Sequence, residues 1–279
     1  NAGNSIESGG NYNVAVGDEA GTAITTGDSN VAVGYAAGLS VTTGTTNTLI
    51  GGLAGDAITT ASSLVAVGYA ALGSNTTGAG NVAVGTNALL DSTTGGNNTA
   101  VGNNSLSNNI TGDDNTVMGF EGMKASTTGA DNTSVGYQSL YDNSTGSFNA
   151  SFGHRALFNN TTASNNTAVG NSALFANTTG ARNFAGGFQA LLANTTGERN
   201  IAVGDAALGA NTTASGNSAF GHRALYTNTT GASNTALGHD ALRLNTTASN
   251  NTSVGYQAGY TNQTAGNNSV YGYQAGYSN

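Results

Sequence analysis

The sequence of 279 residues lacks cysteine, proline and tryptophan, and only 7% of it is charged. Without cysteine there are no disulfide bonds and no thiol chemistry. Six Lys and Arg residues are too few for a basic surface, so we expect no nucleic acid partner. No stretch approaches the roughly 18 consecutive apolar residues of a membrane-spanning helix. We therefore expect no membrane span in this chain.

Large apolar residues are also scarce, since Leu, Ile, Val and Phe total 48. That proportion alone would indicate disorder, but disordered chains are usually highly charged and this one has a net charge of only −8. The chain begins at Asn1 without a charged and apolar leader. We therefore expect a processed chain or a fragment.

What the sequence does contain is an uninterrupted seventeen-residue repeat. It reads N-T-A-V-G-x-x-A-L-x-x-N-T-T-G-x-x, and we number its positions from the opening Asn. Position five is Gly in all 16 repeats, and position fourteen is Thr in all 15 that reach it. Representative residues are Asn166 and Asn200 at position one, Val169 and Val203 at position four, Gly170, Gly187, Gly204 and Gly221 at position five, Leu174 and Leu191 at position nine, and Thr179 and Thr196 at position fourteen.

A strict period predicts coils stacked directly on one another, because one added residue would put all later side chains out of alignment. We predict an all-β parallel β-solenoid, or β-roll, of about 16 coils over residues 13–279. Residues 1–12 do not fit the period, and we interpret them as an N-terminal cap or junction. Helix-pair repeats of twice this length fit poorly, since recurrent Gly and β-branched Val and Thr disfavour helix.

Positions one to four should form the strand, with positions two and four on one face. Neither face is plainly polar, so we expect one to pack inside the coil and the other to meet a second layer or another subunit. Val169 and Leu174 are expected to point inward. The Gly at position five should end the strand, through either a positive φ or a closely passing backbone.

Two further patterns predict how the coil is filled and closed. Position nine is Gly in the first three repeats, and there position twelve becomes Ile24, Val41 or Ile58. We expect these two positions to share core space, because a missing Leu would otherwise leave a cavity. The Asn-Thr-Thr-Gly segment should turn the chain back, with its Asn and Thr residues forming ladders from coil to coil.

The stretches "NVAVGYAAG", "NVAVGTNAL" and "NIAVGDAAL" resemble the head repeats of trimeric autotransporter adhesins, the YadA-like β-roll. The resemblance covers nearly the whole array and is carried by Asn200, Ala202, Val203, Gly204, Ala207 and their equivalents. It implies a left-handed roll in which three chains form one rod-like head, on a bacterial surface or in a related phage or tail fibre. The present repeat is longer than the family's usual one around Asn-Thr-Thr-Gly.

From the repeat and the resemblance we predict a non-enzymatic structural or adhesive fibre domain, extracellular or on a cell surface or virion. Its partners would be further copies, as a trimer or end to end, and a host surface, matrix or glycan receptor. Positions six and ten are candidates for the contact face, although their aromatic residues could equally cover the core or a subunit interface. The candidates are Tyr137, Tyr141, Phe158, Phe175, Phe188, Tyr226 and Tyr256.

Other functions are open. A solenoid with ranks of Thr suits ice binding, but adjacent Thr at positions thirteen and fourteen would point to opposite faces. An open coil end suits a self-assembling filament. His154, His222 and His239 all occupy position six, and His222 and His239 lie in successive coils, so they could share a ligand. No carboxylate or nucleophile recurs with them, so we expect surface histidines and no enzyme, cofactor or metal.

Two sequence patterns suggest other sites. Asp113, Asp114 and Asp131 lack the pattern of calcium-binding solenoids and are interpreted as turn residues. Several Asn-Thr-Thr stretches match the N-glycosylation pattern, but ladder formation accounts for every copy.

Overall fold

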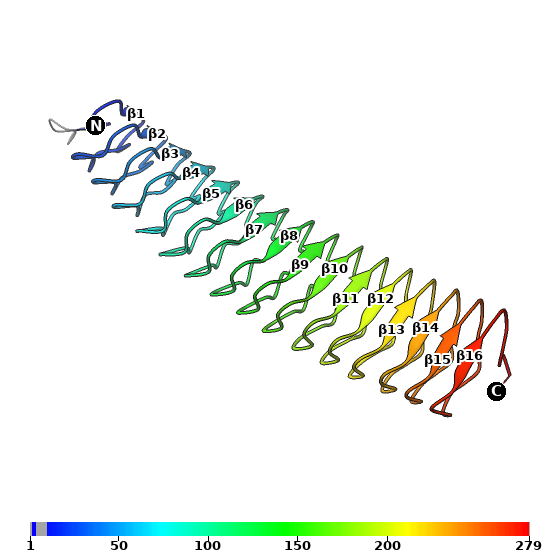
Figure 1. Ribbon diagram of the computed structural model, residues 1–279. Coiled ribbons are helices and arrows are strands. Elements are labelled where there is room, and N and C mark those ends of the chain that lie inside the picture. The colour runs from blue at the N-terminus through cyan, green and yellow to red at the C-terminus, as the bar shows by residue number, and fades with distance from the viewer. Residues whose placement is uncertain (1, 4–9, 279) are drawn as a thin grey trace. The chain divides into compact units, whose positions relative to one another are not determined.

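The computed structural model describes residues 2–3 and 10–278 and contains 16 short parallel β-strands, with no helix in that part of the chain (Figure 1). The predicted all-β solenoid with its seventeen-residue repeat is confirmed. Every strand has three residues and covers positions two to four of its repeat. The remaining positions form the turns that complete each coil.

The strands belong to two compact units, Asn1–Gln138 and Ser139–Asn279. The first unit contains β1 (Val14–Val16), β2 (Val31–Val33), β3 (Thr48–Ile50), β4 (Val65–Val67), β5 (Val82–Val84), β6 (Thr99–Val101), β7 (Thr116–Met118) and β8 (Thr133–Val135). The second contains β9 (Ala150–Phe152), β10 (Thr167–Val169), β11 (Phe184–Gly186), β12 (Ile201–Val203), β13 (Ser218–Phe220), β14 (Thr235–Leu237), β15 (Thr252–Val254) and β16 (Ser269–Tyr271).

Within each unit, successive strands pair in parallel with a constant register of one repeat. Val14 lies opposite Val31 in the first unit, and Thr167 lies opposite Phe184 in the second. Each side chain therefore stacks on the side chain at the same position of the next coil. This stacking explains why the sequence is so uniform, since every residue must suit its own equivalent.

The apolar core is formed by positions three, eight and nine. In the coil of β12, Ala202, Ala207 and Leu208 are completely buried. The expectation that Val169 points inward is wrong, because Val169 is 44% exposed while its neighbour Ala168 is fully buried. Successive strand residues alternate between faces, so placing the Ala inside places the Val outside. Leu174 is fully buried, as expected.

Large core residues compensate for Gly at neighbouring positions. A Cβ added to Gly21 would lie 3.0 Å from Cδ1 of Ile24, so position twelve does fill the space left at position nine. A Cβ on Gly38 would lie 2.8 Å from Cδ1 of Leu49, and one on Gly276 would lie 3.1 Å from Cγ1 of Val270. Position three therefore shares this space as well.

The Gly at position five is required for both of the expected reasons. Gly204 has a φ of +131°, and a Cβ there would lie 2.5 Å from the carbonyl oxygen of Gly221 in the next coil. Residues other than Gly also adopt the left-handed backbone conformation, and they recur at positions seven, nine and seventeen. Leu208, at position nine, has a φ of 50° and is held by a 3.0 Å bond from its N–H to the Ala224 carbonyl. The burial of its side chain offsets the backbone strain.

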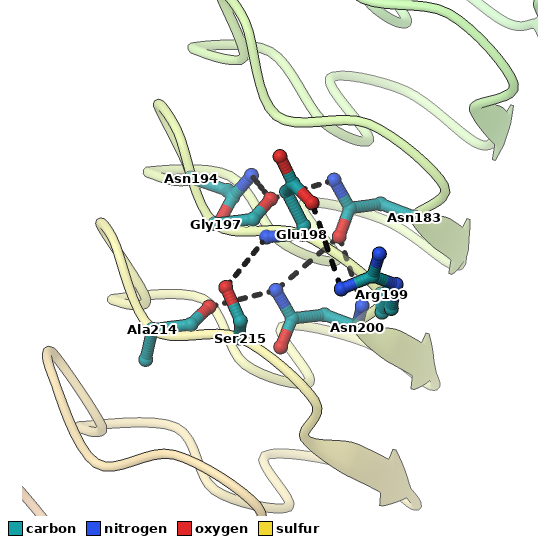
Figure 2. Close-up of polar contacts among 8 residues, drawn as sticks. All are labelled: Asn183, Asn194, Gly197, Glu198, Arg199, Asn200, Ala214 and Ser215. Carbon is teal, nitrogen blue, oxygen red and sulfur yellow. Dashed lines mark hydrogen bonds and ion pairs between the residues drawn. The ribbon is translucent and has the colours of Figure 1, made fainter.

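The rest of the coil interior is polar and contains two ladders of Asn side chains, one at position one and one at position twelve. Figure 2 shows Asn183 and Asn200 of the first ladder and Asn194 of the second. Asn200 at position one and Asn211 at position twelve both donate to the carbonyl of Ala214, at 2.8 and 3.0 Å. Each ladder also runs from coil to coil, since Asn200 donates to Oδ1 of Asn183 through both its backbone N–H and its side chain. The ladder predicted for the Asn of the Asn-Thr-Thr-Gly segment is confirmed at position twelve, and the structure adds a second, unpredicted ladder at position one. Both ladders consist of uncharged side chains.

The predicted N-terminal cap or junction at residues 1–12 falls largely outside the described residues. Gly3, which is described, has a φ of 62° and donates to the Ala20 carbonyl, as Gly21 does to the Ala37 carbonyl one coil later. The separation between Gly3 and Gly21 is nevertheless one residue longer than a repeat, whereas the hydrogen-bonded pair Asn11 and Asp28 is separated by one repeat. The regular spacing therefore starts after Gly3.

Candidate functional site: the outer face of the sheet

The outer surface of each unit's sheet, which we call the sheet face, is formed by positions two and four. The described residues enclose no pocket, so this open surface is the main candidate site. Its most exposed large apolar side chains are Val14, Val16, Ile50 and Met118 in the first unit, and Phe152, Val169, Phe184, Ile201, Phe220, Leu237 and Tyr271 in the second.

The sheet face carries no charge, because no Asp, Glu, Lys, Arg or His occupies position two or four of β1 to β16. Its side chains also adjust to one another. The ring of Phe184 lies over Gly186 in the same strand, since a Cβ on Gly186 would meet Cε1 of Phe184 at 3.2 Å. Here a large residue at position two accompanies the smallest one at position four.

Parallel sheets are normally covered on both faces. In each unit, the inner face packs on Ala at position eight and Leu at position nine, whereas the sheet face has no cover within its unit. Position four is apolar in nearly every strand, whereas position two is Thr or Ser in nine strands. Exposed apolar side chains that recur along a surface in this way are typical of interaction sites.

Aromatic side chains at position six lie along one margin of the sheet face, two residues after position four. In the second unit they form a stack in which the rings of His239, Tyr256 and Tyr273 follow one another at 5.3 Å. Phe120 and Tyr137 stack at 5.4 Å in the first unit. The predicted contact residues Tyr137, Phe188 and Tyr256 are all exposed.

The predicted contact residues at position ten form separate stacks. The rings of Tyr141, Phe158 and Phe175 follow one another at 5.1 and 5.3 Å and are half-buried. Arg155 covers the ring of Phe158, with its Cζ 5.5 Å from the ring centre. Tyr226 is exposed and lies 6.0 Å from Cζ of Arg223. The stacked rings of Tyr141, Phe158 and Phe175 are therefore less exposed than Tyr137, Phe188 and Tyr256 at position six.

The Thr residues play two different roles. Position thirteen forms the hydroxyl ladder, as Thr178 donates from Oγ1 to the carbonyl of Thr195 at 3.1 Å. Thr179 and Thr196, at position fourteen, are exposed. The ladder therefore belongs to position thirteen, and position fourteen forms an exposed row.

Charged groups lie in the turns rather than on the sheet face. Arg199 and Glu198 form a 3.8 Å ion pair at positions seventeen and sixteen (Figure 2). Hydrogen bonds from Lys124 and Gln138 hold the pKa of Glu121 below its usual value. Burial raises the pKa of Asp56 and of Asp142. These carboxylates lie in different coils and do not converge on one another.

The aspartates weighed as a calcium site are turn residues in the structure. Asp113 accepts a 2.7 Å hydrogen bond from the backbone N–H of Gly96, and the backbone N–H of Asp131 donates to the Asp113 carbonyl at 3.1 Å. Within the described part of the chain, the one cluster with metal-ligand geometry consists of His222, His239 and Asp240.

Comparison with protein-family models, curated proteins and solved structures gave no match. Among the described residues there is no helix that could cross a membrane. The features of the chain that bear on its function are therefore the sheet face, its aromatic margin and the repeat itself.

Proposed function

We propose that this chain is a non-enzymatic structural and adhesive fibre domain, exposed on a cell surface or virion, whose sheet face packs against further copies of the same chain as a trimer. The observation that supports this is the uncharged sheet face, which presents an exposed or half-buried apolar residue in every coil and is left uncovered on an otherwise closed coil. The resemblance of the repeat to trimeric adhesin heads supports the same arrangement.

A copy of the chain is the partner that best fits the sheet face. Apolar residues recur there once per coil, at the spacing of hydrogen-bonded parallel strands. A partner contacts every coil in an equivalent way only if its own surface has the same spacing, and a second copy has it by construction. If the copies are related by closed cyclic symmetry, the assembly closes after a fixed number of copies and does not grow further.

We expect a double substitution in the sheet face, Ile201→Lys with Leu237→Lys, to yield monomers without unfolding the coils. Both side chains are exposed, so each Lys is tolerated in one chain but would place uncompensated charge in an interface. The control is Thr213→Lys with Thr247→Lys, which adds the same charge at exposed position fourteen of the same two coils.

Light scattering measures the mass of each protein. The wild type and the control should have the mass of three chains, and the sheet-face variant that of one chain, 27.4 kDa. A monomeric wild type would overturn the trimer. A mass that grows with concentration would instead indicate end-to-end assembly.

Adhesion is proposed to use the aromatic margin at position six. We expect Tyr256→Ala with Tyr273→Ala to reduce the attachment of chain-coated beads to glycan- or matrix-coated surfaces several-fold, because exposed rings are typical anchors. Tyr260→Ala with Tyr277→Ala removes stacked rings from position ten of the same coils and should have a smaller effect. Equal losses in the two variants would contradict the role of position six.

Ice binding is a second candidate, because an ice-binding surface needs two parallel rows of outward-facing side chains. Positions two and four form two such rows, whereas positions thirteen and fourteen do not. Thr occupies position two in β3, β6, β7, β8, β10, β14 and β15. Bulky residues such as Phe152 and Phe220 interrupt the regular surface that ice matching requires, so the fibre is favoured. Thermal hysteresis of the purified chain distinguishes the two functions.

A further inference from the structure

The coils of β13 and β14 bring together two histidines and an aspartate. His222 and His239 occupy position six of successive coils, with their rings stacked at 4.7 Å. Asp240 follows His239, and its Oδ2 lies 3.2 Å from Nδ1 of His239. One ligand atom from each of the three residues lies within 4.8 Å of the other two.

Two polar atoms in this cluster are buried without a hydrogen bond. They are Nδ1 of His222 and Oδ1 of Asp240. The Asp240 side chain is only 7% exposed, a degree of burial at which a carboxylate normally has partners that satisfy both oxygens. Unsatisfied buried groups of this kind call for a ligand or a strain argument.

Arg243 pairs with Asp240 by charge but forms no hydrogen bond with it. Nε of Arg243 and Oδ1 of Asp240 form an ion pair at 3.6 Å, a separation too long for a hydrogen bond. Its guanidinium is held elsewhere, since Nη1 donates to the Tyr260 hydroxyl at 2.9 Å. Arg223, which follows His222, lies over the ring of Tyr226. Oδ1 of Asp240 therefore accepts no hydrogen bond, and a metal ion that binds it replaces the long ion pair with Arg243.

We propose that His222, His239 and Asp240 bind a divalent first-row transition ion of the Zn²⁺ class. Two imidazoles and one carboxylate suit such ions, whereas Ca²⁺ and Mg²⁺ require more oxygen ligands than this cluster offers. Ligand atoms on a tetrahedral zinc lie about 3.3 Å apart, close to the His239–Asp240 separation. The other ligand atoms lie within 4.8 Å of one another, so metal binding requires small side-chain adjustments, and His239 is exposed.

The bound ion would link two successive coils through their side chains, in addition to the backbone bonds that already join them. Asp240 is tied to the preceding coil by a 2.9 Å bond from its N–H to the His222 carbonyl. The two coils that carry the ligands are therefore already joined by a backbone hydrogen bond at the site before the metal binds. Because binding requires the folded coils, it should stabilise them.

The test adds Co²⁺ or Zn²⁺ to the full chain after treatment with a chelator. The wild type should bind one ion per chain, give the visible absorption of nitrogen- and oxygen-coordinated Co²⁺, and melt at a higher temperature with Zn²⁺. His239→Gln and Asp240→Asn should each reduce affinity at least tenfold and lose the Zn²⁺-dependent rise in melting temperature.

His154→Gln is the matched control. His154 also occupies position six, but Arg155 follows it where Asp240 follows His239, so this variant should bind like the wild type. His239 is exposed, so its substitution should leave the metal-free melting temperature unchanged and keep the test independent of folding. Absence of binding by the wild type, or an equal loss in His154→Gln and His239→Gln, would overturn the proposal.

Discussion

Gly204→Val is expected to destabilise the second unit by about 4 kcal/mol, the largest effect of any single substitution considered for this chain. The added Cβ would lie 2.5 Å from the carbonyl oxygen and 2.6 Å from the carbonyl carbon of Gly221. Both atoms belong to the backbone of the next coil, so neither can rotate away. The φ of +131° adds a second cost, because L side chains rarely adopt it.

Two controls separate this effect from a general sensitivity of the coil. Gly216→Asn also replaces a Gly of positive φ, 72°, but a Cβ there would meet its nearest atom at 3.6 Å, and Asn250 occupies the same position later in the chain. Asp205→Val adds a branched side chain next to Gly204, at an exposed position. Both should shift the melting temperature little. Thermal unfolding followed by circular dichroism makes the comparison, and equal shifts for all three variants would contradict the assignment of position five.

Asn200→Asp should cost about 3 kcal/mol at neutral pH although it leaves the shape of the side chain unchanged. The Asn200 amide is completely buried and donates to the carbonyl of Ala214 and to Oδ1 of Asn183. A carboxylate has no proton to donate, so it would face two acceptors inside the coil. The exchange therefore turns two attractive contacts into repulsive ones.

The cost should depend on pH in a defined direction. Burial and the two facing acceptors raise the pKa of the introduced carboxyl above its unfolded value of about 3.9. The protonated carboxyl has one O–H and can donate to one of the two acceptors, so the penalty is smallest below the unfolded pKa and grows as the pH rises towards the folded pKa. The difference in melting temperature between variant and wild type should shrink as the pH is lowered from 7 to 4. A difference that does not change with pH would contradict this account of the ladder.

Asn200→Leu is the matched apolar substitution, and the chain already contains its equivalent. Leu64 occupies position one in the coil of β4 and is fully buried. There the Gly78 carbonyl still accepts hydrogen bonds from Asn75 and Asn81, at 2.9 and 3.3 Å. Losing an Asn without introducing charge should therefore cost about half as much as Asn200→Asp, with no dependence on pH between 4 and 7.

The fold could be predicted from the sequence because spacing alone specifies a stacked solenoid. The role of Gly at position five and the exchange between Gly21 and Ile24 could be predicted for the same reason. These positions stack on their own equivalents and recur in all 16 repeats, so the sequence shows which residues each position accepts. Adjacent large and small residues, by contrast, do not reveal which of them faces inward. Because Val169 is large, we predicted that it faces the core. In the structure Leu174 at position nine fills the core, and the small Ala168 at position three packs beside it.

The sequence could predict only part of the proposed metal site, the two histidines, and not Asp240. The spacing places His222 and His239 in successive coils, but Asp240 occupies a variable position with no recurring carboxylate. Its side chain is buried in a coil that turns through a left-handed residue, with a φ of 57° at Asp240 itself. Left-handed conformations in residues other than Gly depend on hydrogen bonds between coils, which periodicity does not encode.

The constant register also limits how such a chain can change in length. Every described hydrogen bond between two Asn residues of these ladders joins equivalent positions of successive coils, as between Asn200 and Asn183 or between Asn211 and Asn194. An insertion of one residue between two Asn of a ladder would put the coil after it out of register with the coil before it and interrupt the ladder at that junction. Gene segments that encode a whole coil can instead be duplicated or deleted with all contacts restored at the junction. We therefore expect natural variants of this array to differ in length by whole repeats.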